Sequence, residues 1–347
     1  MKVKKFKGYR VQELKKKQRA VLGILVFACL LPYPLTASEW KDKAEAEGKV
    51  VFYATMNTSD ARALTEAFKQ AYPKIDAQFY RTVDAQMMEK ILTEARAGRN
   101  LWDVLATTSL YGYLLKKRGM LAAYDSPERK FYREGFKDPG ATWTSTYTNY
   151  AVFGYNTKLT GKASLPKSYA DLLKPEWAGQ IGMEGRAYEW FATVVSHMGK
   201  EKGLSFMRAL VKHRPQLRTG RTLIAQLVAA GEFNGALTAY SQNFENLKAN
   251  GAPVEWIALD PVFANIHPTA LSAKAPHPNA GRLFIDFVLS KRGQEIMRSF
   301  RRIPDRVDTL PDPPRLVEGI KPAFAPAEVF EDFDRWIKLF REIFGGR

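Results

Sequence analysis

One pattern recurs along this 347-residue chain and limits the folds open to it. A short apolar run with the composition of a buried strand is followed by a polar loop and then by a helical stretch. Lys49–Ala54 is rich in β-branched and aromatic residues, residues 55–60 are polar, and helical periodicity follows. The same order appears in residues 103–118 and 179–198. Strands that alternate with helices predict an α/β fold in which helices cover sheets.

Polar loops follow the predicted strands in both halves of the chain. In open α/β sheets, ligands bind just beyond the carboxyl ends of strands, where helix N-termini offer free backbone N–H groups to anions. We therefore expect a cleft between two halves that captures a small solute and closes about a hinge. The candidate ligand-binding residues are Thr55, Asn57, Thr108, Ser109, Arg186, Tyr188, Tyr240 and Ser241.

Two of these residues have a structural alternative. Tyr240 directly follows the apolar run Ala236–Ala239, so its phenol either contacts a ligand or caps a core strand with its hydroxyl hydrogen-bonded. Arg186 lies in a turn that opens a helix. It either binds a carboxylate or phosphate through two parallel hydrogen bonds, or it is a surface arginine near Glu184 and Glu189. The residues alone leave both alternatives open.

The N-terminus has the layout of a secretory signal. Residues 2–19 are basic, residues 20–31 are apolar, and a small residue, Ala37, precedes the expected cleavage point. The apolar segment is too short to span a membrane comfortably. Cys29 is the only cysteine, and the bulky Phe27 before it makes lipidation the less favoured alternative. We expect an exported, periplasmic protein without an intramolecular disulfide.

Charge argues for anions as ligands and against nucleic acid. The net charge is +17, but residues 1–37 hold nine Lys and Arg against one Glu, and the remainder carries 44 basic and 35 acidic residues. A positive domain can steer anions toward a cleft. After residue 40, no basic stripe interleaved with aromatic residues occurs, which argues against nucleic-acid binding.

Motifs for catalysis are missing from the sequence. It contains no phosphate-binding glycine loop, no G-x-S-x-G elbow and no H-E-x-x-H motif. The four histidines lack the spacing of metal ligands, and His267 and His277 each precede a proline, so we expect both in loops. We predict no catalytic residues and no enzyme activity.

Several short motifs occur in the order found in one known family. They include Val50–Thr55, Trp102–Val104, Tyr155–Lys158 and Ser290–Glu295. Through them, residues 48–306 resemble the bacterial extracellular solute-binding proteins of ABC importers, in the ferric-iron-binding-type branch. The resemblance implies a periplasmic-binding-protein-like fold of type II, with two α/β lobes joined by crossing hinge strands and a cleft between them. It also implies delivery of the solute to a membrane permease, and we expect a monomer.

The resemblance further implies where the lobes begin and end. After a signal peptide at residues 1–37, lobe 1 combines residues 38–149 with 256–306. Lobe 2 spans residues 150–255 and so interrupts the first lobe. Residues 307–347 are expected to form a linker and a helix that packs on the lobes.

The identity of the solute depends on how this chain departs from iron-binding relatives. Such proteins use a histidine in the first loop, a carboxylate after the third strand and adjacent tyrosines in the second lobe, often with an exogenous anion. This chain offers Asn57, Thr108 and Tyr240 followed by Ser241 at those places. We therefore expect a small anionic organic solute or organophosphate, no metal and no cofactor. Ferric iron (Fe3+) held by Tyr240 and Tyr188 is the alternative, and an exported enzyme or a chemosensory solute receptor is a further one.

Overall fold

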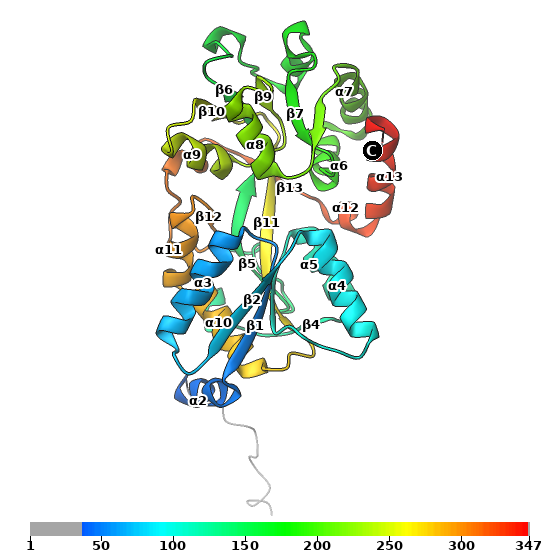
Figure 1. The fold of residues 1–347 in the computed structure, drawn as a ribbon. Coiled ribbons are helices and arrows are strands. Elements are labelled where there is room, and N and C mark those ends of the chain that lie inside the picture. Colours follow the sequence, from blue (N-terminus) through cyan, green and yellow to red (C-terminus); the bar gives the residue numbers. More distant parts are fainter. Residues whose placement is uncertain (1–36, 346–347) are drawn as a thin grey trace, which may run out of the picture. The chain divides into compact units, whose positions relative to one another are not determined.

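The polypeptide from Ala37 to Gly345 is described by a computed structural model. The expected signal segment up to residue 36, with Cys29, lies outside the described residues. Residues from Trp40 onward form a single unit by their internal contacts, which contains two β-sheets and the helices that cover them (Figure 1). Within residues 37–345, no helix combines the length and the apolar composition needed to cross a membrane.

The first sheet has eight strands in the order β12–β5–β11–β3–β1–β2, with β4 and β13 also paired to β11. β1 is parallel to β2 and β3, whereas β11 is antiparallel to β3 and β5. Because β11 lies between β5 and β3, this sheet needs residues from distant parts of the chain. Its strands are β1 (Lys49–Ala54), β2 (Asp76–Arg81), β3 (Val104–Ala106), β4 (Leu121–Ala122), β5 (Thr144–Tyr150), β11 (Val262–Ser272), β12 (Ile303–Pro304) and β13 (Pro322–Phe324).

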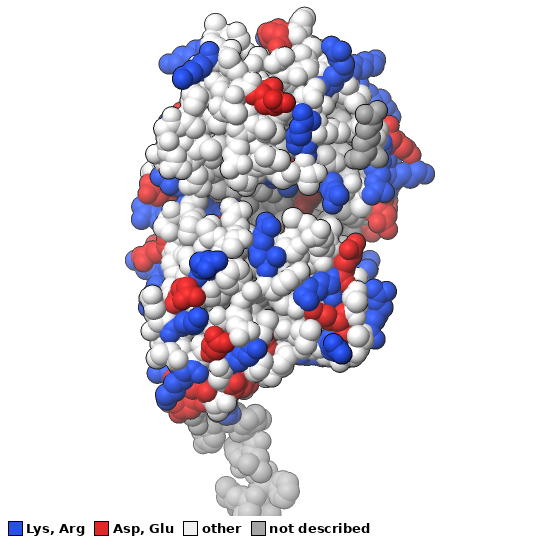
Figure 2. Space-filling model, in the orientation of Figure 1, with Lys and Arg blue, Asp and Glu red and all other residues white. Residues whose placement is uncertain are grey.

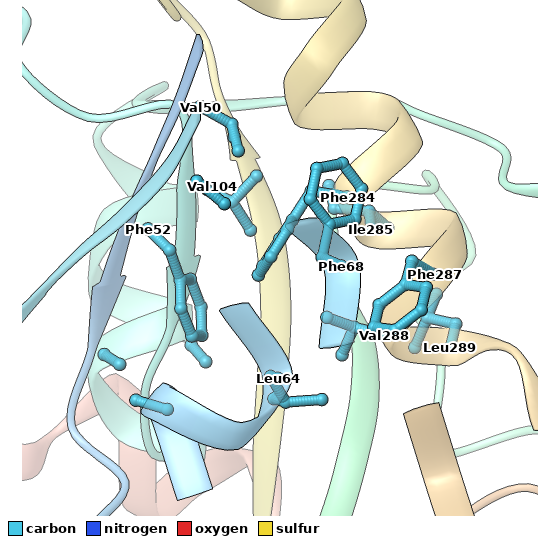
Figure 3. Close-up of a cluster of buried hydrophobic side chains, with 14 of the residues drawn as sticks. Val50, Phe52, Leu64, Phe68, Val104, Phe284, Ile285, Phe287, Val288 and Leu289 are labelled. Carbon is cyan, nitrogen blue, oxygen red and sulfur yellow. The ribbon is translucent and has the colours of Figure 1, made fainter. Parts of the chain in front are cut away.

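Helices pack on this first sheet through aromatic and aliphatic side chains. The rings of Phe52 and Phe284 have centroids 5.0 Å apart, and Phe68 lies edge-on to Phe284 at the same distance (Figure 3). Such tilted and edge-to-face contacts add to the stabilisation that burial provides. The helices are α3 (Thr58–Ala71), α4 (Asp84–Arg96), α5 (Ser109–Lys117), α10 (Pro278–Leu289) and α11 (Lys291–Ser299), and α2 (Ala37–Glu47) precedes β1.

The second sheet has five strands in the order β10–β6–β9–β7–β8. β7 is parallel to β8 and β9, whereas β6 is antiparallel to β9 and β10. Its core includes Phe153, Trp190 and Phe191, all fully buried. The strands are β6 (Phe153–Asn156), β7 (Ile181–Glu184), β8 (Gln216–Arg218), β9 (Gly235–Ala236) and β10 (Val254–Ile257). The helices are α6 (Tyr188–Met198), α7 (Lys200–Lys212), α8 (Arg221–Ala230) and α9 (Ser241–Ala249).

The chain passes between the two sheets at two adjacent crossings. Residues 151–152 join β5 to β6, and residues 258–261 join β10 to β11. At the first crossing, the N–H of Ala151 donates to the carbonyl of Phe263 at 2.9 Å, and Ala151 also pairs with Tyr240. The crossing strands expected from the sequence are therefore present, and backbone hydrogen bonds tie them to the start of α9.

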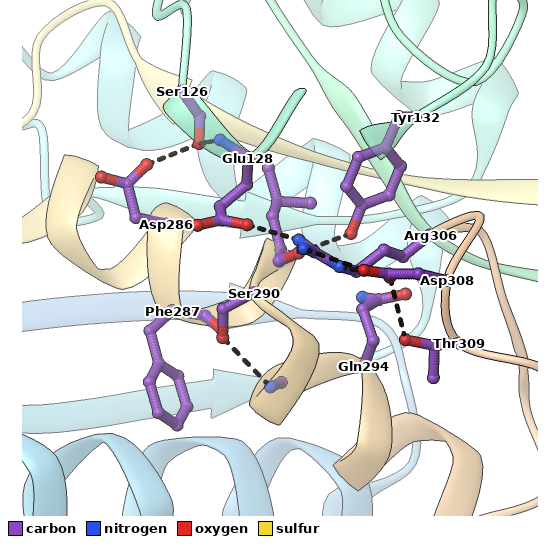
Figure 4. Close-up of polar contacts among 12 residues, drawn as sticks. Ser126, Glu128, Tyr132, Asp286, Phe287, Ser290, Gln294, Arg306, Asp308 and Thr309 are labelled. Atoms are coloured by element: carbon purple, nitrogen blue, oxygen red, sulfur yellow. Dashed lines mark hydrogen bonds and ion pairs between the residues drawn. The ribbon is translucent and has the colours of Figure 1, made fainter. Parts of the chain in front are cut away.

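A buried polar cluster fastens the segment after α11 to the short helix η1 and to the end of α10 (Figure 4). The guanidinium of Arg306 donates to Glu128, to Asp308 and to the carbonyl of Leu289. Arg306 is 6% exposed, so these bonds compensate a charge that is largely removed from water. Glu128 belongs to the short 3-10 helix η1. The 3-10 helices are η1 (Pro127–Phe131), η2 (Lys162–Ser164), η3 (Tyr169–Leu173), η4 (Pro175–Trp177) and η5 (Pro314–Leu316).

The C-terminal segment adds one strand and two helices. β13 pairs with β11, and α12 (Ala327–Glu331) and α13 (Phe333–Phe344) follow. The sequence predicts one helix over residues 326–344, but it is broken at Asp332, whose φ of −121° and ψ of 45° are not helical. Phe340 of α13 packs edge-on against Phe191 of α6 at 5.6 Å. The exact limits of the two lobes stay a prediction.

Candidate functional site

A cavity of about 440 Å³ opens where loops from both sheets meet. Its walls come from residues that follow β1, β3, β7 and β8, from the start of α9 and from β11. Figure 2 shows a hollow across one face of the protein, with Lys and Arg side chains beside it. The volume is within the range of sites that enclose small molecules.

Most of the residues singled out from the sequence line this cavity. They are Thr55, Asn57, Thr108, Arg186, Tyr188 and Tyr240. Ser109 and Ser241 do not line it. The hydroxyl of Ser109 bonds Glu189 Oε1 at 2.5 Å and Asn265 Oδ1 at 3.2 Å, and Ser241 is 1% exposed. Ser241 therefore sits behind the cavity wall, and Ser109 lines a second cavity.

Several helices begin at the cavity. Asn57 is the N-cap of α3, Thr108 that of α5 and Tyr240 that of α9, and α8 begins at Arg221. The first N–H groups of a helix have no partner within the helix, and the helix dipole favours negative charge at this end. Convergence of these N-termini makes the cavity attractive to an anion.

Asp84 orders the hydroxyl-rich loop after β3. Its Oδ1 accepts hydrogen bonds from Thr107 Oγ1 at 2.8 Å and from the N–H and Oγ1 of Thr108 at 3.2 and 3.3 Å. The hydroxyl of Thr108 is thus already engaged. Thr55, by contrast, has a buried hydroxyl that lacks a partner among the described residues. The hydroxyl of Thr55 can therefore still form a hydrogen bond with a bound solute.

Tyr240 combines the two roles that the sequence left open. It lines the cavity, yet it is only 7% exposed and its hydroxyl accepts a hydrogen bond from Asn265 Nδ2 at 3.3 Å. The guanidinium of Arg221 stands 4.7 Å from the centre of its ring. Burial raises the pKa of the Tyr240 phenol, and Arg221 only partly offsets this. The phenol is therefore a neutral wall of the cavity at physiological pH.

Arg221 is a cavity residue that the sequence reasoning missed. It is the first residue of α8, its Nε donates to the carbonyl of Thr238 at 3.1 Å, and its ring contact with Tyr240 fixes its direction. The sequence does contain an indication, because residues 216–218 are expected to form a short strand and a helical stretch follows them, as at the other loops. The arginine lies in the same kind of position as Arg186.

Three arginines of the lining have no carboxylate partner among residues 37–345. These are Arg81, Arg186 and Arg221, none of which forms a salt bridge within 4.0 Å. Arg302 also lines the cavity but is different, because its Nη2 lies 2.7 Å from Asp60 Oδ2. Three guanidinium groups are thus available to an anion, and the fourth is neutralised.

Glu184 and Glu189 of the lining accept hydrogen bonds from other groups of the protein. Glu184 accepts from backbone N–H groups of the loops after β7 and β8. Burial raises the pKa of Glu189 to about 7, although the hydrogen bond from Ser109 and the charge of Arg221 oppose this. Glu189 is therefore partly neutral near pH 7. Near pH 7 the cavity wall therefore carries less negative charge than it would if every carboxyl group were ionised.

His267 lies in strand β11, not in the loop expected from the proline that follows it. Arg302 Nη1 donates to Asn149 Oδ1 at 3.0 Å, so the amide nitrogen of Asn149 faces His267 Nε2 at 2.9 Å. Nε2 is then the acceptor, and the ring is neutral with its proton on Nδ1. Burial and the charge of Arg302 agree, since both lower the pKa of His267 well below its usual value.

The lining does not assemble a cluster of metal ligands. Among residues 37–345, no group of three or more His, Cys, Asp and Glu side chains is arranged to hold an ion. The phenyl ring of Tyr188 packs edge-on against Phe340 of α13 at 5.0 Å, so this side chain is partly committed to the C-terminal helix.

A second, larger cavity of about 750 Å³ lies on the other face of β11. Ala264, Ile266 and Pro268 line it, whereas Asn265 and His267 line the first cavity, as the two-residue period of a strand requires. Its other walls are mainly apolar and come from α5, from the loop of residues 134–143, and from β13 and α12. Strand β11 thus separates a polar cavity from an apolar one.

Comparison with protein families and curated proteins identifies relatives. The family model described as bacterial extracellular solute-binding protein matches residues 103–325. A protein of Haemophilus influenzae named only as uncharacterized is 25% identical over 289 residues, covering 79% of this chain and 82% of that protein. The Fe(3+)-binding periplasmic protein of Serratia marcescens is 23% identical over 268 residues, covering 74% of this chain and 78% of that one.

Solved structures with the same fold bind different ligands. Iron-bound HitA from Pseudomonas aeruginosa is similar with a TM-score of 0.75 and 22% identity, covering 85% of this chain and 99% of that one. AfuA from Actinobacillus pleuropneumoniae, with fructose-6-phosphate bound, is similar with a TM-score of 0.76 and 21% identity, covering 86% and 99%. At these identities the likeness establishes the fold and leaves the ligand to be argued from the cavity.

Proposed function

We propose that this chain, which belongs to the bacterial extracellular solute-binding proteins, captures a small anionic organic solute or organophosphate in its arginine-lined cavity. The family consists of substrate-binding proteins, and the binding proteins of ABC importers hand their solute to a membrane permease. We further propose that the protein acts as a monomer in the periplasm after export, without a resident metal or cofactor.

The observation that carries this proposal is the set of unpaired guanidinium groups. Arg81, Arg186 and Arg221 line one cavity without carboxylate partners among the described residues, and helix N-termini point to the same space. Guanidinium groups bind carboxylates and phosphates through paired, charge-assisted hydrogen bonds. A neutral or cationic solute would leave these charges uncompensated when the cleft closes.

Thr55 and Tyr240 supply the remaining polar contacts in this proposal. Thr55 has an unused buried hydroxyl, and Tyr240 offers a neutral phenol beside Arg221. AfuA, which shares the fold, was solved with fructose-6-phosphate. That ligand has one phosphate and several hydroxyl groups, a combination that suits a wall of arginines and hydroxyls.

Ferric iron is the second candidate cargo, because the Serratia relative is named for it and HitA was solved with iron. Tyr240 and Tyr188 would be its phenolate ligands. Burial raises the pKa of Tyr240, which disfavours the phenolate, and the lining offers no cluster of further ligands among residues 37–345. Iron would need an anion held by the arginines to complete its coordination.

A thermal-shift screen separates the two candidates. Hexose phosphates, glycerol phosphate and citrate are added to the full-length protein, since a ligand that binds only the folded state raises Tm. We expect at least one to stabilise the wild type and to lose its effect in Arg221→Met. Arg208→Met, which changes an exposed arginine on α7 away from the cavity, is the matched control.

The iron candidate has its own readout. Ferric citrate should leave the protein colourless, because no iron–phenolate absorption band forms at Tyr240. A visible band that disappears in Tyr240→Phe would favour iron instead. If no anionic compound raises Tm, the organic-anion proposal is wrong, with or without an iron band.

A further inference from the structure

Glu184 occupies an unusual position at the cavity wall. It is the last residue of β7 and is 5% exposed. Its Oε1 accepts a hydrogen bond from the N–H of Arg186 at 3.2 Å, and its Oε2 accepts one from the N–H of Gly220 at 2.7 Å. No Lys, Arg or His forms a salt bridge with it among residues 37–345. Backbone N–H groups, rather than a cation in contact, hold this carboxylate.

The two N–H groups belong to loops that each open a helix. Arg186 precedes α6, and Gly220 precedes α8, which begins at Arg221. Free N–H groups at such places are the usual receptors for phosphate and carboxylate oxygens. Here both are taken by an oxyanion that the chain itself supplies.

The backbone is shaped for this arrangement. Gly220 has a φ of +105°, which L side chains rarely adopt, and this conformation turns its N–H toward Glu184. At the other end, Glu184 is fixed because its own N–H donates to Thr238 Oγ1 at 2.7 Å. The carboxylate is therefore locked between the two loops.

We propose that Glu184 is a built-in anion that fills the oxyanion position between the loops preceding α6 and α8. The solute must then place its negative group against the guanidinium groups of Arg81, Arg186 and Arg221, and no separate anion binds beside it. This inference rests on the proposed function, since it defines which part of the cavity the anionic solute uses. It disfavours a cargo that needs a synergistic anion at these N–H groups.

The test removes the carboxylate of Glu184 and asks whether a small anion from solution takes its place. Glu184→Ala removes the carboxylate and leaves a space with two unpaired N–H groups, whereas Glu184→Gln keeps the volume and removes only the charge. Sodium formate should raise Tm of the Ala variant, with an apparent affinity about tenfold or more above that for the wild type. The Gln variant, in which the space is filled, should respond like the wild type. Sodium chloride at equal ionic strength controls for general salt effects.

The proposal is overturned if folded Glu184→Ala responds to formate no more than Glu184→Gln does. Should the Ala variant not fold, amide NMR of the wild type decides. The scalar coupling across the hydrogen bond from the Gly220 N–H to the Glu184 carboxyl group should persist during titration with inorganic phosphate, and its loss would mean that phosphate displaces Glu184. Failure of the organic-anion function appears separately, as no stabilisation of the wild type by any solute in the screen.

Discussion

The carboxyl group of Glu189 links helices that cover different sheets. Glu189 belongs to α6, and it accepts a hydrogen bond from the hydroxyl of Ser109 at the start of α5. Its pKa is raised from 4.5 to about 7 by burial. Below pH 4.5 the group is protonated in both folded and unfolded protein, and above about pH 7 it is charged in both. Between these values the folded state must keep a proton that the unfolded state releases, so its contribution to stability falls as pH rises.

Glu189→Gln should therefore remove part of the pH dependence of stability. Relative to the wild type, we expect the variant to gain about 2–3 kcal/mol between pH 4.5 and pH 8. Burial also raises the pKa of Asp286 to about 6 and of Asp305 to about 7, with the same sign. For this reason, urea midpoints of variant and wild type are compared at each pH. Parallel curves would contradict the prediction.

Arg302 of the cavity lining and Asp60 behind it form a deeply buried ion pair. Their side chains are 4% and 2% exposed. Removing one partner leaves an uncompensated charge, so Arg302→Met should lower the free energy of unfolding by about 3–5 kcal/mol. The double variant Arg302→Met with Asp60→Asn should recover much of this loss. Urea denaturation measures both, and a loss of under about 1 kcal/mol in the single variant would mean that water already compensates Asp60.

The site residues that could be predicted from the sequence are those that directly follow a strand. Tyr240 follows an apolar run and precedes a helix, so its place at the cavity could be expected from the sequence. Asn265 and His267 could not, because they lie inside β11, and the sequence does not show which face of that strand lines the cavity. Arg221 could have been predicted, because it follows the loop after a short strand, but that strand has a weak sequence pattern.

At the scale of elements, α6 and α7 show how closely two helices approach. A Cβ on Gly203 of α7 would lie 2.6 Å from the Cα of Val195 in α6, which is backbone and cannot move aside. Gly203→Ala should therefore cost about 1–3 kcal/mol of stability through overpacking. Gly161→Ala is the matched control, because nothing lies within 4 Å of its Cβ. Equal urea midpoints for the two variants would refute the close packing.

Elements with a strong local pattern were also the ones that could be predicted. The run Lys49–Ala54 is strand β1 as expected. The strand expected over Ala236–Ala239 is shorter, since β9 ends at Ala236 and the next residues lead to the hinge crossing. Pairing partners decide such limits, and these come from distant parts of the chain that a local pattern does not contain.

At the scale of the whole molecule, the family match and the fold likeness confirm the predicted family and its type II periplasmic-binding-protein fold. One apolar cluster draws on both sheets, with Tyr150 and Val262 from the first, and Phe233 and Trp256 beside the second. We expect calorimetry to show a single unfolding transition whose calorimetric and van't Hoff enthalpies agree. Two separate transitions would mean that the sheets unfold independently.

Strand β11 has a practical consequence for sensing. Because adjacent residues of this strand face different cavities, a dye in the apolar cavity would lie one strand's thickness from the bound solute without touching it. Ala327 lines that cavity at the start of α12, and the sequence has no cysteine beyond Cys29. If the segment with Cys29 is removed as the sequence leads us to expect, a fluorophore on Ala327→Cys would be attached at one defined position, as a reporter that leaves the arginines free.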